Sequence, residues 1–96
     1  MMYVHMFAFR MKHGVKAEIK DQMVAEIRAL QSEIPAIQES WIGLNESPRS
    51  GGYELGGAMK FASKASFETY GPHPAHQRLV AWLKPLIEPI EVDFPC

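Results

Sequence analysis

The segment from Tyr70 to His76 reads YGPHPAH and holds the side chains best suited to chemistry in this chain. A neutral imidazole can take a proton from a carbon acid, and a phenol can donate a hydrogen bond to the enolate oxygen that results. We therefore interpret His76 as the candidate general base and Tyr70 as the candidate oxyanion donor. Together they predict cofactor-free acid/base catalysis on a carbonyl compound.

Two other interpretations of this segment stay open. His73 and His76 are three residues apart, a spacing that can share a metal ion. No cysteine or carboxylate accompanies them nearby in sequence, and Pro74 restricts the geometry, so we expect no metal. In the purely structural interpretation, His73 caps a helix that begins at Pro74, while Tyr70 and His76 only pack at its start.

Further ligand contacts are expected from side chains outside the catalytic pair. His5 shares a strand face with Phe7, where an imidazole among aromatic rings would orient a polar group of a small molecule. The glycine pairs of this chain lack the spacing of a phosphate-binding loop, and no G-x-S-x-G segment occurs, so we expect no cofactor and no covalent hydrolase. The candidate ligand-binding residues are His5, Phe7, Trp41 and His73.

The first element that must position these residues is a strand over residues 3–11. Alternation places the aromatic side chains and His5 on one face, and Val4, Met6 and Ala8 on the other. Both faces are apolar, which is typical of a strand whose sheet is covered on both sides.

The remaining elements follow from periodicity and from helix and turn signals. Residues 16–34 predict a helix because apolar side chains recur every three or four positions, and Pro35 ends it. Later segments predict strands at 36–45 and 53–61 joined by a loop at 46–52, helical segments from Ser63 to about Tyr70 and from Pro74 to about Lys84, and a last strand at 88–94.

The resulting order, β-α-β-β-α-β, is that of a ferredoxin-like α+β domain over residues 1–96. We expect a four-stranded antiparallel sheet with helices on one face. Because the first strand is apolar on both faces, the other face of the sheet needs a cover, and a second copy is the simplest one. The prediction is a homodimer through the sheet face, a dimeric α+β barrel whose cavity takes a small apolar or aromatic molecule.

Composition excludes several other classes of function. The net charge is −1 and charges of both signs are mixed along the 96 residues, so we expect neither nucleic-acid nor membrane binding. No apolar run approaches the roughly 20 residues of a membrane span, and the apolar start lacks the basic region of a signal peptide. Cys96 is the one cysteine, which excludes an internal disulfide and favours a cytoplasmic location.

Several short motifs, spread over nearly the whole chain, follow one family pattern. They are His5, IPAI at 34–37, GLNES at 43–47, GY at 52–53, KFAS at 60–63, YGPHPAH at 70–76 and IEVDF at 90–94. Together they resemble the stress-responsive A/B barrel (Dabb) family of the dimeric α+β barrel superfamily. The resemblance implies a ferredoxin-like monomer whose sheet pairs with that of a second chain.

The family's activities are less uniform than its fold, so the resemblance leaves alternatives open. Many members have no known activity. One plant member cyclises a linear polyketide thioester by an intramolecular aldol reaction and uses a tyrosine and a histidine that match Tyr70 and His76. Its third-strand histidine corresponds to Leu55 here. The alternatives are a non-catalytic stress-response or binding module and a cofactor-independent monooxygenase, since the superfamily includes such enzymes.

Overall fold

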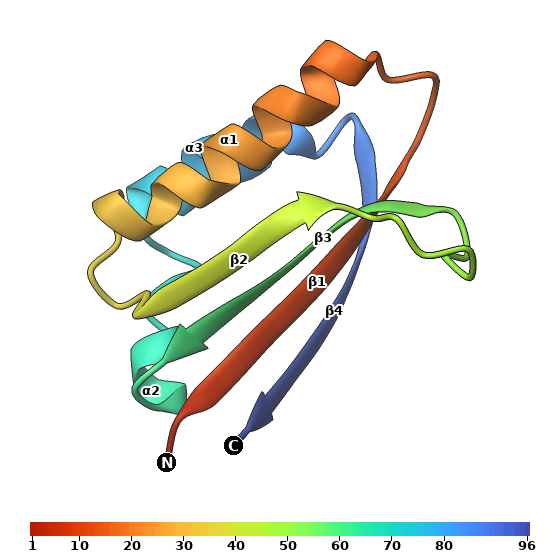
Figure 1. The fold of residues 1–96 in the computed structure, drawn as a ribbon. Coiled ribbons are helices and arrows are strands. Elements are labelled where there is room, and N and C mark those ends of the chain that lie inside the picture. The colour runs from red at the N-terminus through yellow and green to blue at the C-terminus, as the bar shows by residue number, and fades with distance from the viewer.

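The computed structural model describes residues 1–96 as one antiparallel sheet with its helices against one face (Figure 1). The strands lie in the order β2-β3-β1-β4, and β1 pairs with both β3 and β4. The predicted ferredoxin-like α+β architecture is confirmed. The elements are β1 (Tyr3–Met11), α1 (Ala17–Glu33), β2 (Glu39–Leu44), β3 (Tyr53–Phe61), α2 (Lys64–Phe67), α3 (Pro74–Leu83) and β4 (Ile87–Pro95).

Two predicted element bounds are wrong. The second strand begins at Glu39 rather than at residue 36, because the Ile37 amide still bonds to the carbonyl of Ile34 in a turn. The helix that begins after Ser63 ends at Phe67 instead of near Tyr70. Beyond it the backbone continues through turns whose hydrogen bonds join residues three apart, such as the bond from the Tyr70 amide to the carbonyl of Phe67.

The hydrophobic core lies between the helices and the sheet. The apolar stripe of α1, which includes Met23 and Ile27, packs toward the fully buried β3 side chains Leu55, Met59 and Phe61. Each such side chain contributes about 1.5–3 kcal/mol when it is removed from water. Leu55 is therefore a core residue.

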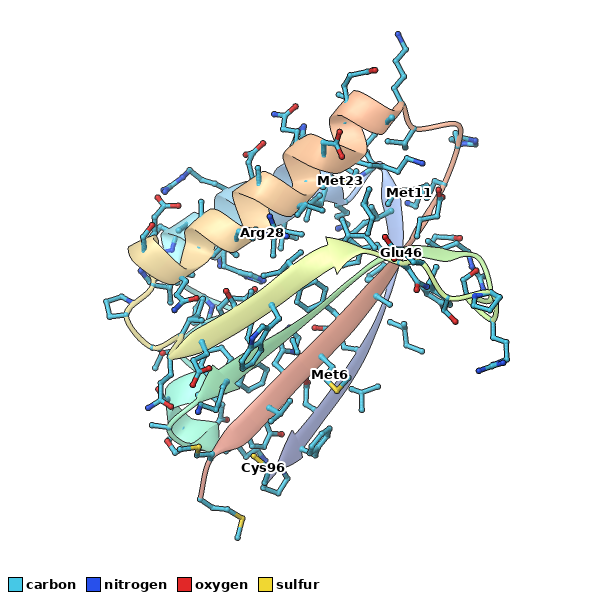
Figure 2. The ribbon with its side chains drawn as sticks, in the orientation of Figure 1. Met6, Met11, Met23, Arg28, Glu46 and Cys96 are labelled. Carbon is cyan, nitrogen blue, oxygen red and sulfur yellow. The ribbon has the colours of Figure 1, made fainter.

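Polar side chains of α1 hold this helix over the free edge of β2. The Arg28 guanidinium donates two hydrogen bonds to the Ile42 carbonyl, from Nη2 at 2.7 Å and Nε at 3.1 Å (Figure 2). Gln31 donates to the carbonyl of Gln38. These bonds satisfy backbone groups that an edge strand otherwise leaves unpaired. They also keep α1 above β2, so the β4 side of the sheet is left to α3 and to the site described below.

The face of the sheet away from the helices has no cover from this chain. We call it the open face, and Figure 2 shows Met6 projecting from it. Met6 pairs with Val92 on β4 and with Ala58 on β3, and Ala58 pairs with Trp41 on β2, so these side chains form one apolar surface. The large side chains of this surface are 40–55% exposed: Met6, Trp41, Ile90, Val92 and Phe94.

No helix of the chain is both long and apolar enough to cross a membrane.

Candidate functional site

A cavity of about 610 Å³ lies between α3 and the helix-covered face of β1 and β4. His5, Tyr70 and His76 line it together with the rings of Phe7 and Phe9. Charged side chains also line it, at Lys12, Lys84, Glu88 and Glu91. A mainly apolar cavity with a few convergent polar groups is the usual form of a small-molecule site.

The start of α3 positions His76. The His73 imidazole caps the helix by accepting a hydrogen bond from the Ala75 amide at 3.1 Å, and Pro74 takes the first helical position. His76 Nδ1 then lies 3.0 Å from the carbonyl oxygen of Gly71. Because a carbonyl oxygen can only accept, Nδ1 carries the proton, and the lone pair of the neutral ring is on Nε2.

The surroundings of His76 favour the neutral imidazole. Burial is the largest cause that lowers its pKa, and His5 and His73 add to this effect. The hydrogen bond to Gly71 and the charge of Glu91 act in the opposite direction without reversing the shift. A histidine with a lowered pKa is unprotonated at neutral pH and can act as a base.

Tyr70 lies directly beside this base. Its ring centroid is 4.3 Å from that of His76, and only 6% of the residue is exposed. Burial raises the pKa of the phenol well above its ordinary value, and the negative charge of Glu91 raises it further. The hydroxyl therefore keeps its proton throughout the neutral range and is available as a hydrogen-bond donor.

His5 reaches the same place from β1. It is buried, and its ring centroid lies 5.7 Å from that of Tyr70. Its Nδ1 is 2.5 Å from Asp93 Oδ1, and its Nε2 is 3.8 Å from Glu91 Oε1. Three chain segments, β1, the turn before α3 and the first turn of α3, thus bring the predicted His5, Tyr70 and His76 together at one end of the cavity.

The two carboxylates of β4 are functional candidates that the sequence interpretation missed. Asp93 lies directly opposite His5 in the β1–β4 pairing, and Glu91 lies opposite Phe7. The alternation of acidic and apolar residues in EVDF was a usable signal, because it puts both acids on one face of the strand. It could not show that this face meets His5.

Replacing Asp93 with alanine is expected to lower the free energy of unfolding by about 1–3 kcal/mol, because it leaves the buried His5 Nδ1 without its partner. Urea denaturation at neutral pH measures this cost. Glu91→Ala is the matched control: its carboxylate is 61% exposed and more distant from His5, so we expect a smaller loss. Equal losses for the two variants would contradict the role given to Asp93.

The structure separates two of the predicted ligand-binding residues from the cavity. Trp41 was expected at the ligand, but it is 55% exposed on the open face, because it alternates with the buried Ile42 on β2. His73 was expected there too, but its ring turns back to cap α3. Phe7 lines the cavity, next to His5. No group of three or more His, Cys, Asp or Glu side chains is placed to hold a metal ion.

Comparison with known proteins places this geometry in context. The model of the stress responsive A/B barrel domain, Dabb, matches residues 4–96. No curated protein matches the chain.

Solved structures with the same fold include proteins with and without a named activity. A dimeric ferredoxin-like protein of unknown function from Thermobifida fusca is 22% identical, with a TM-score of 0.88 over 100% of this chain and 92% of that one. The hydroxynitrile lyase of Passiflora edulis is 20% identical, with a TM-score of 0.87 over 97% and 91%. A mutant of SnoaB, a cofactor-independent oxygenase from Streptomyces nogalater, is 16% identical, with a TM-score of 0.77 over 99% and 92%.

The first of these is described as dimeric, as are further ferredoxin-like proteins of unknown function that share this fold. At these identities the likeness to each structure shows a common fold. The family match covers nearly the whole chain and includes every strand and helix that builds the cavity, so this protein belongs to the stress-responsive A/B barrel (Dabb) family.

Proposed function

We propose that the protein binds a small carbonyl compound in this cavity and catalyses proton transfer at the carbon next to the carbonyl, with no cofactor. The observation that carries the proposal is the contact between His76 Nδ1 and the Gly71 carbonyl oxygen, 3.0 Å apart. The Gly71 carbonyl fixes the proton on Nδ1, while Tyr70 and an apolar cavity lie beside the ring.

The proposed reaction begins with His76 Nε2 taking a proton from the carbon next to the carbonyl. The electron pair of the broken C–H bond moves onto the carbonyl oxygen and forms an enolate, to which the Tyr70 hydroxyl donates a hydrogen bond. The enolate then takes a proton back from His76. Alternatively, its carbon attacks a second carbonyl carbon of the same molecule, as in an aldol cyclisation; the C=O π bond there breaks, and the alkoxide oxygen that results takes the proton from His76. Such general base catalysis contributes about 10²–10⁴-fold.

We also propose that the working form is a homodimer joined through the open face. The support is the row of exposed apolar side chains on that face, including Met6, Val92 and Trp41, together with the description of solved relatives as dimers. Monomeric proteins rarely expose a contiguous apolar surface of this kind. The cavity lies on the opposite face of each sheet, so each protomer would keep its own site.

Exchange of hydrogen for deuterium at the methyl group of an aryl methyl ketone tests the proposal without knowledge of the natural substrate. Nuclear magnetic resonance of acetophenone and acetylnaphthalene in D₂O follows the exchange directly. We expect the protein to exceed the rate of buffer containing free imidazole at equal concentration. A purified dimer that binds these ketones and adds nothing to the exchange would favour the alternative of a binding module without turnover.

The pH dependence of this exchange follows from the lowered pKa of His76. A protonated imidazole cannot act as a base, so the rate must fall as the pH drops through the pKa of the folded protein. Because burial lowers that pKa from its ordinary 6.5, we expect a constant rate around neutrality and a decline centred below 6.5. A rate profile measured from acid to neutral pH checks this, and a midpoint above 6.5 would contradict it.

Two solved relatives suggest further test compounds for the same base. A cyanohydrin, the substrate class implied by the Passiflora enzyme's name, would lose its hydroxyl proton to His76 and split into a carbonyl compound and cyanide. A phenol would lose its proton and become reactive toward oxygen, the activity class in the name of the Streptomyces protein. Cyanide release from mandelonitrile and oxygen consumption with phenols therefore complete the set of assays.

A further inference from the structure

Gly57 leaves room for the ring of Phe7, and this pair carries a further inference. Phe7 and Gly57 lie directly opposite each other in the β1–β3 pairing. A Cβ atom at position 57 would approach the Phe7 ring carbons Cε2 and Cε1 to 2.8 and 2.9 Å, and Cζ more closely still. Real Cβ atoms essentially never lie within 3.0 Å of such carbons, so the present position of the ring requires a glycine at 57.

The position of the Phe7 ring decides how much of the cavity is open. Across the sheet, Phe7 has Gly57 on one side and Glu91 on the other, and Phe7 and Glu91 both line the cavity. With Gly57 the ring leans onto the bare backbone of β3. A side chain there would displace the ring, and we expect the ring to move toward Glu91, on the side of the cavity.

The Phe7 ring is also the middle of a row of rings along β1. Its centroid is 5.5 Å from that of His5 and 5.3 Å from that of Phe9, with planes inclined by only 35° and 30°. The row begins at the polar end, where His5 meets Tyr70, and runs along the apolar part of the cavity. Aromatic rings make favourable stacked or edge-to-face contacts with other aromatic rings, so this lining suits a flat aromatic ligand.

We propose that Phe7 and Gly57 together determine the specificity of the cavity. In this arrangement the ligand has a flat aromatic body that lies on the Phe7 and Phe9 rings, and a carbonyl group that lies at Tyr70 and His76. The inference deepens the proposed function and rests on the same cavity. The proposed function concerns the reaction, whereas this inference concerns the shape of the ligand. Binding measurements alone can test the shape.

Prodan, a flat fluorescent naphthyl ketone whose emission reports the polarity around it, is a suitable probe. We expect blue-shifted emission and saturable binding to the native protein, with acetylnaphthalene competing more strongly than cyclohexyl methyl ketone. Gly57→Ala should weaken Prodan binding by about tenfold or more, because the displaced Phe7 ring fills the cavity. No binding of Prodan to the native dimer, or equal competition by the two ketones, would overturn the inference.

A double-mutant cycle separates loss of cavity shape from general damage. In the Phe7→Leu background the clashing ring is absent, so the further change Gly57→Ala should alter Prodan affinity less than about twofold. Additive effects of the two changes would overturn the inference. Gly56→Ala is the matched control on the same strand, because its Cβ would meet the nearest atom, the Phe7 carbonyl oxygen, at an ordinary 3.8 Å and leave the ring in place.

A further pair of measurements keeps this inference distinct from the proposed catalysis. His76→Gln should lower proton exchange by about 10²–10⁴-fold, whereas competition against Prodan should still favour acetylnaphthalene over cyclohexyl methyl ketone, because that preference is set by the Phe7 and Phe9 rings. If Gly57→Ala does not fold, Phe7→Leu alone decides the question. It should lower the preference for acetylnaphthalene over cyclohexyl methyl ketone, and an unchanged preference would overturn the inference.

Discussion

Replacing His76 with glutamine is expected to lower the rate of proton exchange at a bound ketone by about 10²–10⁴-fold. The glutamine amide can still donate a hydrogen bond to the Gly71 carbonyl, so the start of α3 and the cavity wall should be retained. What is lost is the basic Nε2 beside Tyr70. The measurement is the exchange rate of acetylnaphthalene in D₂O at saturating ketone, with circular dichroism and thermal unfolding to confirm the fold.

The matched control for this experiment is the same substitution at His13. That residue is exposed in the loop between β1 and α1 and does not line the cavity. His13→Gln should leave the exchange rate unchanged. Tyr70→Phe should retain binding and lose the part of the rate that comes from the enolate hydrogen bond. A folded His76→Gln protein that exchanges within about twofold of the native rate would show that another group is the base.

Replacing Met6 with glutamate is expected to convert the proposed dimer into monomers. Met6 lies in the middle of the open face between Ala58 and Val92, so in a dimer formed through this face its side chain would be buried against the second sheet. An unpaired carboxylate in such a place, with its symmetry copy nearby, costs several kcal/mol. At about 1.4 kcal/mol per tenfold, this corresponds to a rise of roughly 10³-fold in the dimer dissociation constant.

Native mass spectrometry and light scattering across a dilution series measure this change. Ala25→Glu introduces the same charge on the exposed side of α1 and should leave the dimer intact. A Met6→Glu protein that stays dimeric at the native dissociation constant would place the dimer contact elsewhere. The cavity lies on the opposite face, so the exchange rate per folded monomer separates an effect on assembly from an effect on the site.

Local patterns were sufficient to predict the order of elements, and they also single out the candidate pair Tyr70 and His76. Alternation along residues 3–11, the apolar stripe of α1 and the proline at position 74 are signals carried by neighbouring residues, and the structure contains each predicted element. The closeness of the Tyr70 and His76 rings in space also has a local cause, because only five residues separate them in the sequence. One turn and the first turn of a helix bring their rings together with little help from the rest of the chain.

Trp41 shows what such patterns cannot decide. Alternation on β2 separates Trp41 from Ile42, but it does not tell which of the two faces the helices. That choice follows from the pairing of β2 with β3 and from the bonds that Arg28 makes to the Ile42 carbonyl and Gln31 to the Gln38 carbonyl just before β2. The tryptophan consequently lies on the open face, and the cavity lies between the helices and the sheet.

The sequence by itself determined the ferredoxin-like fold and the candidate base with its phenol, because short-range periodicity and helix-capping chemistry specify both. Only the tertiary structure decided that Asp93 meets His5, 88 residues away, and that Gly57 makes room for Phe7. Both contacts depend on the register of strands paired across long stretches of chain. Register is set by the packing of the whole sheet against its helices, which no segment of the sequence encodes alone.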